Sequence, residues 1–420
     1  MAEEKNFINF HVLISHSPSC LNRDDQNMQK RAVFGGVERI RISSQSLKRA
    51  MRRPPENAFN YWQDALGDPS VRTRDPIKVA DLFSEELKKE FPKDVVLRAT
   101  QLFVKTSADE GDDEGDADDA GAWDADSKKK IAVAPWAIAE IREICRLVST
   151  VKLTDEEAGK AKEKFAKQKG KKQKPVEAFL DQAIINKIKK ALESNVGNLE
   201  NALASAIDIA LWGRMATSGL MTSIDGSLAV AHAITTHAAQ ADTDWFTAVD
   251  DLIQDSGEVG AGHLDTQEFS SGVFYRYASL NIKQLQKNLG GATRERALEI
   301  GKHVFHMLCT VVPSAKQQSF AAHNLADFAI ATFDDQPISL ANAFEQPVVA
   351  EKNSGYRSPS IDCLVKYSQH MKKVHGLGSL AVSAPRGLHD TTANGIRSLD
   401  SFPEVEEWIA KNGPATAAKE

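Results

Sequence analysis

Apolar and polar residues alternate in two short segments near the start of the chain. In residues 7–14 (FINFHVLI) the even-numbered positions are apolar and two of the positions between them are polar. This spacing predicts a β-strand with one face buried against a core. In residues 37–42 (VERIRI) two isoleucines point to one side of a second expected strand, and Arg39 and Arg41 point to the other. We therefore expect these arginines on a face or edge of a sheet.

A helix is expected directly after the second strand. Ser43 and Ser44 are good N-cap residues, and the segment 45–53 (QSLKRAMRR) that follows has helical spacing. Its apolar stripe consists of Leu47, Ala50 and Met51. Lys48 and Arg52 are four residues apart, so we expect them to share a second, exposed face.

The later part of the chain mixes helical and strand patterns. Apolar residues recur at helical spacing in 131–150 and 176–211. Residues 273–282 and 328–333 have strand patterns, and the helical segment 294–312 lies between them. This β-α-β order on a mostly antiparallel sheet predicts an α+β fold with a ferredoxin-like, RNA-recognition-domain-like sheet.

The distribution of charge changes the picture given by the net charge. The formal net charge is -6, but residues 109–126 hold ten Asp or Glu and no basic residue, so the remainder carries +4. Such a segment cannot form a core, and we expect a disordered acidic insertion at 107–130. A lysine-rich segment follows at 159–174.

The basic residues are concentrated in residues 35–53, which hold six Arg or Lys and one Glu. Serine and glutamine side chains, a helix N-terminus and basic side chains together suit a phosphate backbone. The four cysteines lie far apart without a Cys-x-x-Cys pair, so neither a zinc site nor a disulfide framework is indicated. No apolar run approaches the roughly 18 residues of a membrane span, and we expect a cytoplasmic protein.

Several blocks of sequence resemble one known family. They are HVLISHSPSCLNRDDQNMQK, FGGVERIRISSQSLKRAMR, GRMATSG, AHAITTH, DWFTAVDDL and HLDTQEFSSGVFYRY, and they occur in order between residue 6 and about residue 345. They resemble the CasC family, the repeated backbone subunit of the type I-E CRISPR surveillance complex Cascade. Little resemblance is seen after residue 350.

The resemblance implies a fold shaped like a right hand. Its palm resembles an RNA-recognition domain, its fingers are helical and its thumb is a β-hairpin. The expected boundaries are palm 1–60, 213–239 and 272–410, fingers 61–212, thumb 240–271 and tail 411–420.

The resemblance also implies a function. Copies of the family polymerise along CRISPR guide RNA, and each thumb folds over the RNA and displaces one base. The guide pairs with target DNA, so base pairing supplies the specificity. The implied partners are guide RNA, target DNA, other copies of the chain, and the large, small and end-capping subunits of Cascade. The implied protein is not an enzyme and has no metal, cofactor or membrane partner.

Carried over residue by residue, the resemblance implies an RNA-binding set. Met215, beside Arg214, would lie against the displaced base, and an apolar wedge in the thumb would hold the base step apart. The thumb residues are Trp245, Phe246 and Thr247. The phosphate and sugar contacts are Arg23, Lys30, Ser43, Ser44, Gln45, Lys48, Arg49, Arg52 and Lys316.

Other interpretations fit parts of the same pattern. Met215, Trp245 and Phe246 are residue types that commonly pack in a core. Asp24 and Asp25 would suit a metal-dependent RNA endonuclease, as in cleaving relatives of the same superfamily, although NRDDQN is also typical of an Asx turn. A DNA-binding regulator that uses the helix at 44–53 is a third possibility.

Deleting residues 109–126 should leave RNA binding intact, because this acidic segment would repel phosphate. The measurement is the dissociation constant for single-stranded RNA of the deletion variant and of the full chain. Weaker binding by the deletion variant would contradict this prediction.

Overall fold

The computed structural model gives a mixed α+β protein with one large sheet, which confirms the α+β part of the expected fold class. Contacts divide the chain into two compact units. Unit 1 is Met1–Asp68, Ser227–Gln286 and Ala292–Glu420, and unit 2 is Pro69–Gly226 and Lys287–Gly291. The structure describes residues 4–54, 59–105, 134–166, 176–194, 202–215, 223–248, 263–350, 355–386 and 396–413.

The units differ at their edges from the expected hand-like division. Residues 61–68, expected in the fingers, belong to unit 1, and residues 213–226, expected in the palm, belong to unit 2. The acidic insertion expected at 107–130 lies outside the described residues. Of the lysine-rich segment at 159–174, the structure describes residues 159–166, which are helical.

The sheet of unit 1 is built around strand β1. Among the described residues the strand order is β12-β11-β10-β1-β9-β7-β3-β2, with β6 and β8 also paired to β9. Every pairing in it is antiparallel except β11 with β12. The strands are β1 (Phe7–Ser19), β2 (Arg31–Phe34), β3 (Val37–Ile42), β6 (Leu228–Val230), β7 (Ala233–Thr235), β8 (Asp242–Ala248), β9 (His263–Asn281), β10 (Phe328–Asp334), β11 (Leu380–Ala384) and β12 (Arg397–Ser398).

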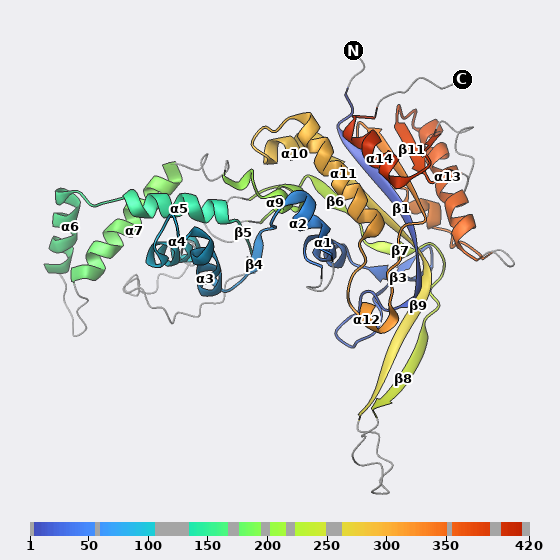
Figure 1. Cartoon of the computed structure of the whole chain (residues 1–420), viewed down its shortest axis with the longest axis horizontal. Coiled ribbons are helices and arrows are strands. Elements are labelled where there is room, and N and C mark those ends of the chain that lie inside the picture. Colours follow the sequence, from blue (N-terminus) through green and yellow to red (C-terminus); the bar gives the residue numbers. More distant parts are fainter. Residues whose placement is uncertain are drawn as a thin grey trace, which may run out of the picture. The chain divides into compact units, whose positions relative to one another are not determined.

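Helices lie on both faces of this sheet (Figure 1). On one face Phe10 of β1 packs against Phe305 of α11, and on the other Leu13 lies in a core cluster with Ile361 and Leu364 of α13. The helical elements are α1 (Ser44–Arg52), α2 (Tyr61–Leu66), α11 (Arg294–Thr310), α12 (Gln317–Phe320), the 3-10 helix η1 (Ala341–Phe344), α13 (Arg357–Val374) and α14 (Phe402–Ala410), while α10 (Ile282–Asn288) begins in unit 1 and ends in unit 2.

The expectation that the first strand has a single buried face is wrong. Every residue from Ile8 to Ile14 is buried, including Asn9 and His11. The polar side chains are accommodated by buried partners, since Asn9 donates to Asp334 at 2.9 Å and His11 Nδ1 lies 2.8 Å from the Tyr275 hydroxyl. Strand β1 is central and covered on both faces, so its polar side chains form buried hydrogen bonds and are not exposed to solvent.

Other expected elements are confirmed with shifted ends. The helix expected at 294–312 is α11, and the strand expected at 328–333 is β10. The strand expected at 273–282 is the second part of a much longer strand, β9. Its first part pairs with β8 in a hairpin that extends from the sheet (Figure 1).

Unit 2 is mostly helical, as the apolar spacing predicts. Its buried core includes Phe83, Leu87, Trp136, Ile144 and Ile188. The helix expected from 131 begins only at Ile138, after a short strand. The elements are β4 (Val71–Thr73), α3 (Pro76–Leu87), α4 (Lys93–Lys105), β5 (Ala134–Trp136), α5 (Ile138–Thr150), α6 (Asp155–Ala166), α7 (Val176–Ser194) and α9 (Ile207–Trp212). No helix in the described parts of either unit is long and apolar enough to cross a membrane.

Arg39 of β3 is completely buried, so the expectation that it decorates the sheet surface is wrong. Its guanidinium donates to the carbonyl oxygens of Phe34 at 3.2 Å, Thr235 at 3.1 Å and Phe344 at 2.8 Å. Burial lowers the pKa of Arg39. One side chain therefore holds the end of the neighbouring strand β2 and two backbone segments that are distant in sequence.

Arg276 of β9 has a similar role at the end of α11. Its Nη1 donates to the carbonyl oxygens of Leu308 at 2.9 Å and Val311 at 2.8 Å. Carbonyl groups at a helix C-terminus have no partner within the helix and carry partial negative charge, so a buried cation is stabilised there.

Arg39→Ala should lower the free energy of unfolding by about 3 kcal/mol, because buried carbonyl groups lose charged donors. The matched control is Arg41→Ala on the same strand, where the side chain is half-buried and the expected cost is below about 1 kcal/mol. Chemical denaturation of the isolated protein measures both changes. Equal changes would contradict the structural role of Arg39.

Candidate nucleic-acid interface

The first turn of α1 (Ser44–Arg52) presents polar side chains at the helix N-terminus. Ser43 is the N-cap, and its hydroxyl accepts a hydrogen bond from the Ser46 amide at 3.2 Å. The first turn contains no acidic residue, so the positive end of the helix dipole is not neutralised within it. Gln45 and Arg49 are exposed and lie four residues apart, on one helix face.

The remaining residues of α1 agree only in part with the exposure expected from the sequence. The apolar stripe is buried, which confirms the prediction for Leu47, Ala50 and Met51. Lys48 is half-buried, and Arg52 is only 5% exposed, so the expectation that Arg52 lies on an exposed face is wrong. The long aliphatic stem of arginine packs easily along a core boundary, which helical spacing alone does not reveal.

A tight turn, residues 22–30, lies against the start of α1. The Ser43 amide donates to the Asn22 side chain at 2.8 Å. Asp24 accepts hydrogen bonds from the amides of Gln26 at 3.0 Å and Met28 at 2.9 Å, so its carboxylate caps the turn. Arg23 is exposed on the same turn.

Glu268 of β9 fastens this turn to the base of the β8–β9 hairpin. It is 2% exposed, accepts a hydrogen bond from the Gln29 amide at 2.9 Å and forms an ion pair with Arg31. The Gln29 side chain also accepts from Ser270 at 2.8 Å. Glu268 was not among the contact residues expected from the sequence. Its sequence signal is weak, since it is one of two carboxylates inside the strand sequence HLDTQEFSSG.

Lys316 joins the same surface from the start of α12. Its amide donates to the Cys20 carbonyl at 3.2 Å, and its ammonium group donates to Gln267 at 2.7 Å. Burial raises the pKa of the Cys20 thiol, while the positive charges of Lys316 and Arg23 oppose that rise. Both cations therefore lie close enough to Cys20 to act on it.

His232, next to β7, is a second residue of this surface that sequence analysis missed. Its Nδ1 accepts a hydrogen bond from the Ser44 amide at 2.9 Å. Burial lowers the pKa of His232, and the nearby charges of Arg41 and Lys30 lower it further. A neutral imidazole can accept this hydrogen bond, so His232 orients the first turn of α1.

Across the described ranges no group of three or more His, Cys, Asp or Glu could hold a metal ion.

The β8–β9 hairpin carries the expected thumb residues. Trp245 pairs with Thr266 and is 67% exposed, which disagrees with the alternative that it packs in a core. Phe246 and Thr247 pair with Asp265 and Leu264.

Arg214 and Met215 lie in unit 2 and differ sharply in exposure. The Arg214 side chain is fully buried and forms an ion pair with Glu140, whereas Met215 is 85% exposed. The alternative that Met215 belongs to a core is therefore wrong for the isolated chain.

The structure thus brings five of the expected residues of unit 1 onto one connected surface, defined here as the basic surface. The connections run from Lys316 through Gln267 and Glu268 to the turn, and from the turn to α1. The charge of Glu268 is paired with that of Arg31, and the Asp24 carboxylate accepts amide hydrogen bonds within its own turn. A surface of this kind suits phosphate groups. The five residues are Arg23, Lys30, Ser43, Ser44 and Lys316.

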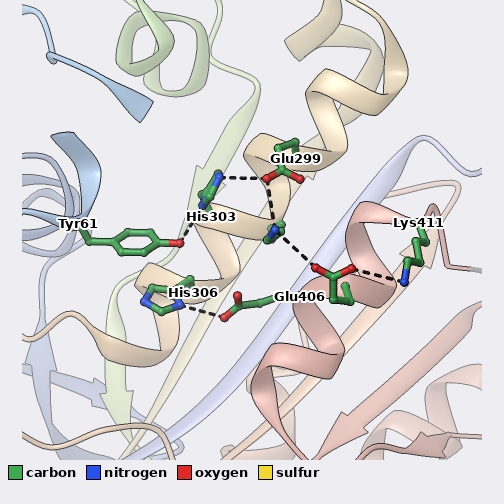
Figure 2. Close-up of polar contacts among 8 residues, drawn as sticks. Tyr61, Glu299, His303, His306, Glu406 and Lys411 are labelled. Atoms are coloured by element: carbon green, nitrogen blue, oxygen red, sulfur yellow. Dashed lines mark hydrogen bonds and ion pairs between the residues drawn. The ribbon is translucent and has the colours of Figure 1, made fainter. Parts of the chain in front are cut away.

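A separate polar cluster ties α2 to α11 and α14 (Figure 2). The Tyr61 hydroxyl lies 2.7 Å from His303 Nδ1, and its ring stacks on His306 with 4.0 Å between centroids. His306 in turn lies 2.9 Å from Glu406 of α14. Burial and the charges of Glu406 and Glu299 raise the pKa of Tyr61 to about 12. These side chains take one another as partners, so the cluster fastens three helices together.

The chain is similar to known proteins both in sequence family and in structure. The family model described as CT1975-like protein matches residues 8–408. A chain of a solved CRISPR RNA-guided surveillance complex, pre-nicking, is 27% identical, with a TM-score of 0.69 over 97% of this chain and 100% of that one. A chain of another CRISPR RNA-guided surveillance complex is 22% identical, with a TM-score of 0.55 over 96% and 98% of the two chains.

A search of curated proteins found no match. The family match extends to residue 408, so the expectation of little resemblance after residue 350 is wrong. In this last part α13 and α14 pack on the same sheet as the earlier elements, which makes it an integral part of unit 1.

Proposed function

The chain belongs to the CT1975-like protein family, and on that premise we propose that it is a guide-RNA-binding subunit of a CRISPR RNA-guided surveillance complex. The observation that carries the proposal is the basic surface. Its cations and hydrogen-bond donors come from separate parts of the chain and are joined by buried or half-buried contacts. A strand of RNA bound there would be held through its backbone, without regard to base sequence.

The finer proposal is a repeated backbone subunit of the type I-E complex. Copies of the chain polymerise along the guide RNA, which pairs with target DNA. In this proposal the sheet of unit 1 is a palm of the RNA-recognition-domain type, unit 2 forms the fingers and the β8–β9 hairpin is the thumb. Its support is the resemblance of the sequence blocks to the CasC family, while the 27% identity over nearly the full length of both chains supports the surveillance complex in general. The large, small and end-capping subunits of Cascade are the further partners, and the cytoplasm is the proposed location.

The expected contact residues divide by exposure. Arg23, Gln45 and Arg49 are exposed and are assigned to phosphate groups. Trp245 offers an exposed aromatic face, which can hold a base by stacking. The remaining proposed contacts are Lys30, Ser44, Lys48, Met215, Phe246, Thr247 and Lys316, whereas Ser43, Arg52 and Arg214 are buried.

We propose a binding role without catalysis. The carboxylate of Asp24, considered above for metal-dependent cleavage, accepts two backbone hydrogen bonds of its own turn. Labelled guide RNA and its complementary RNA should therefore stay intact when incubated with the protein and Mg²⁺. Cleavage that is abolished by Asp25→Asn would contradict a purely binding role.

Arg23→Ala combined with Arg49→Ala should weaken binding of single-stranded RNA and make its salt dependence shallower. Each lost phosphate contact removes about 0.7 from the slope of log K against log salt, so the slope should change by about 1.4. Both side chains are exposed, so the melting temperature of the protein without RNA should be nearly unchanged.

The matched control is Lys366→Ala with Lys373→Ala, which removes two exposed charges from α13, away from the basic surface. It should leave the slope unchanged. Equal slopes for the two double variants would mean that Arg23 and Arg49 do not contact RNA phosphate groups.

A further inference from the structure

A buried ion pair lies directly beside the exposed methionine of unit 2. Arg214 Nη1 and Nη2 donate to the two carboxylate oxygens of Glu140 at 2.6 and 2.8 Å. The exposed fractions of the two side chains are 0% and 1%. This is the two-pronged geometry in which an arginine and a carboxylate pair most strongly. The guanidinium therefore presents no surface to a phosphate group in solution.

The backbone at Arg214 is held as firmly as its side chain. Arg214 and Ile224 exchange two backbone hydrogen bonds of 2.9 and 2.8 Å. Gly213 has a φ of +75°, and an added Cβ there would lie 2.6 Å from the Ile224 carbonyl oxygen. At Gly226 an added Cβ would lie 2.8 Å from the carbonyl carbon of Trp212. Two glycines thus allow two backbone segments to pass in close contact, and this contact fixes the position of residue 214.

The direction of Met215 follows from this arrangement. Successive side chains of an extended, paired backbone point to opposite sides. Since Arg214 points inward to Glu140, Met215 points outward, and it is 85% exposed. Its side chain is therefore accessible to the guide RNA that the proposed function places there.

We infer that Arg214 is a positioning residue: held by Glu140, it fixes the backbone so that Met215 faces the RNA, and it does not itself bind phosphate. This inference rests on the proposed function and assigns a role within it to Glu140, which the sequence patterns did not single out. In the proposed function the partner of Met215 is a nucleobase of single-stranded RNA, and an unbranched, polarisable side chain can pack against any base face without reading its edges.

Glu140 and Arg214 depend on each other for charge compensation. Burial raises the pKa of Glu140, and the hydrogen bonds and charge of Arg214 oppose this rise. Removing either partner alone leaves the other buried without compensation, whereas replacing both by apolar residues of similar size can preserve folding. The paired replacement is therefore the informative variant.

The test compares the full chain with Glu140→Leu combined with Arg214→Met, and with Met215→Ala. Binding of single-stranded RNA of mixed sequence is measured over a series of salt concentrations, together with the melting temperature without RNA. We expect the paired variant to keep the wild-type salt slope, since no phosphate contact is lost. Met215→Ala should weaken binding about tenfold at an unchanged slope, the scale of one lost base contact.

A proximity measurement separates positioning from plain structural support. RNA carrying photoreactive 4-thiouridine should crosslink to the peptide that contains Met215. Glu140→Gln keeps the shape of the side chain but weakens its hold on Arg214, so this crosslink should fall severalfold in the folded fraction. An unchanged crosslink in folded Glu140→Gln protein would overturn the positioning role.

The outcomes distinguish this inference from its premise. A slope that becomes shallower by about 0.7 in the paired variant would show that Arg214 contacts phosphate, and would overturn the inference alone. Absence of RNA binding by the full chain would overturn the proposed function and the inference together. If the paired variant does not fold, the crosslink from Glu140→Gln decides.

Discussion

The buried guanidinium groups of Arg39 and Arg276 hold backbone carbonyl groups in unit 1 that are distant in sequence. Arg39 joins β3 to the residue that ends β7 and to the 3-10 helix η1, and Arg276 joins β9 to the C-terminal end of α11. A buried charge needs hydrogen-bond acceptors around it, which makes these contacts strict constraints on geometry. Helix α11 and η1, which these contacts hold, pack on the two faces of β1.

The basic surface is likewise held together by contacts between segments that are distant in sequence. It is formed by a turn, a helix N-terminus, the base of a hairpin and the start of α12, none of which is rigid by itself. Glu268 and His232 join these pieces by accepting hydrogen bonds from the amides of Gln29 and Ser44. A surface built this way presents its cations in a fixed arrangement, so less freedom is lost when a phosphate backbone binds.

Arginine serves three physical purposes in this chain. Arg39 and Arg276 satisfy buried carbonyl groups, Arg214 compensates a buried carboxylate, and Arg23 and Arg49 remain exposed. The same side chain suits all three because it is always charged and offers five donors in a planar group. A count of positive charges therefore overstates the surface available to RNA. In residues 35–53, Arg39 and Arg52 contribute to folding more than to surface charge.

By itself the sequence determined the elements whose signal is local. The cap at Ser43, the apolar stripe of α1, and the spans of α11 and β10 depend on neighbours within a few residues, so their patterns were sufficient. Motif blocks carried the family resemblance, though not its extension to residue 408. Only the tertiary structure decided which polar residues are buried, because burial depends on what packs above each position. Asn9, Arg39 and Arg214 have ordinary surface-like patterns in the sequence, but each is buried beside a partner contributed by a distant segment.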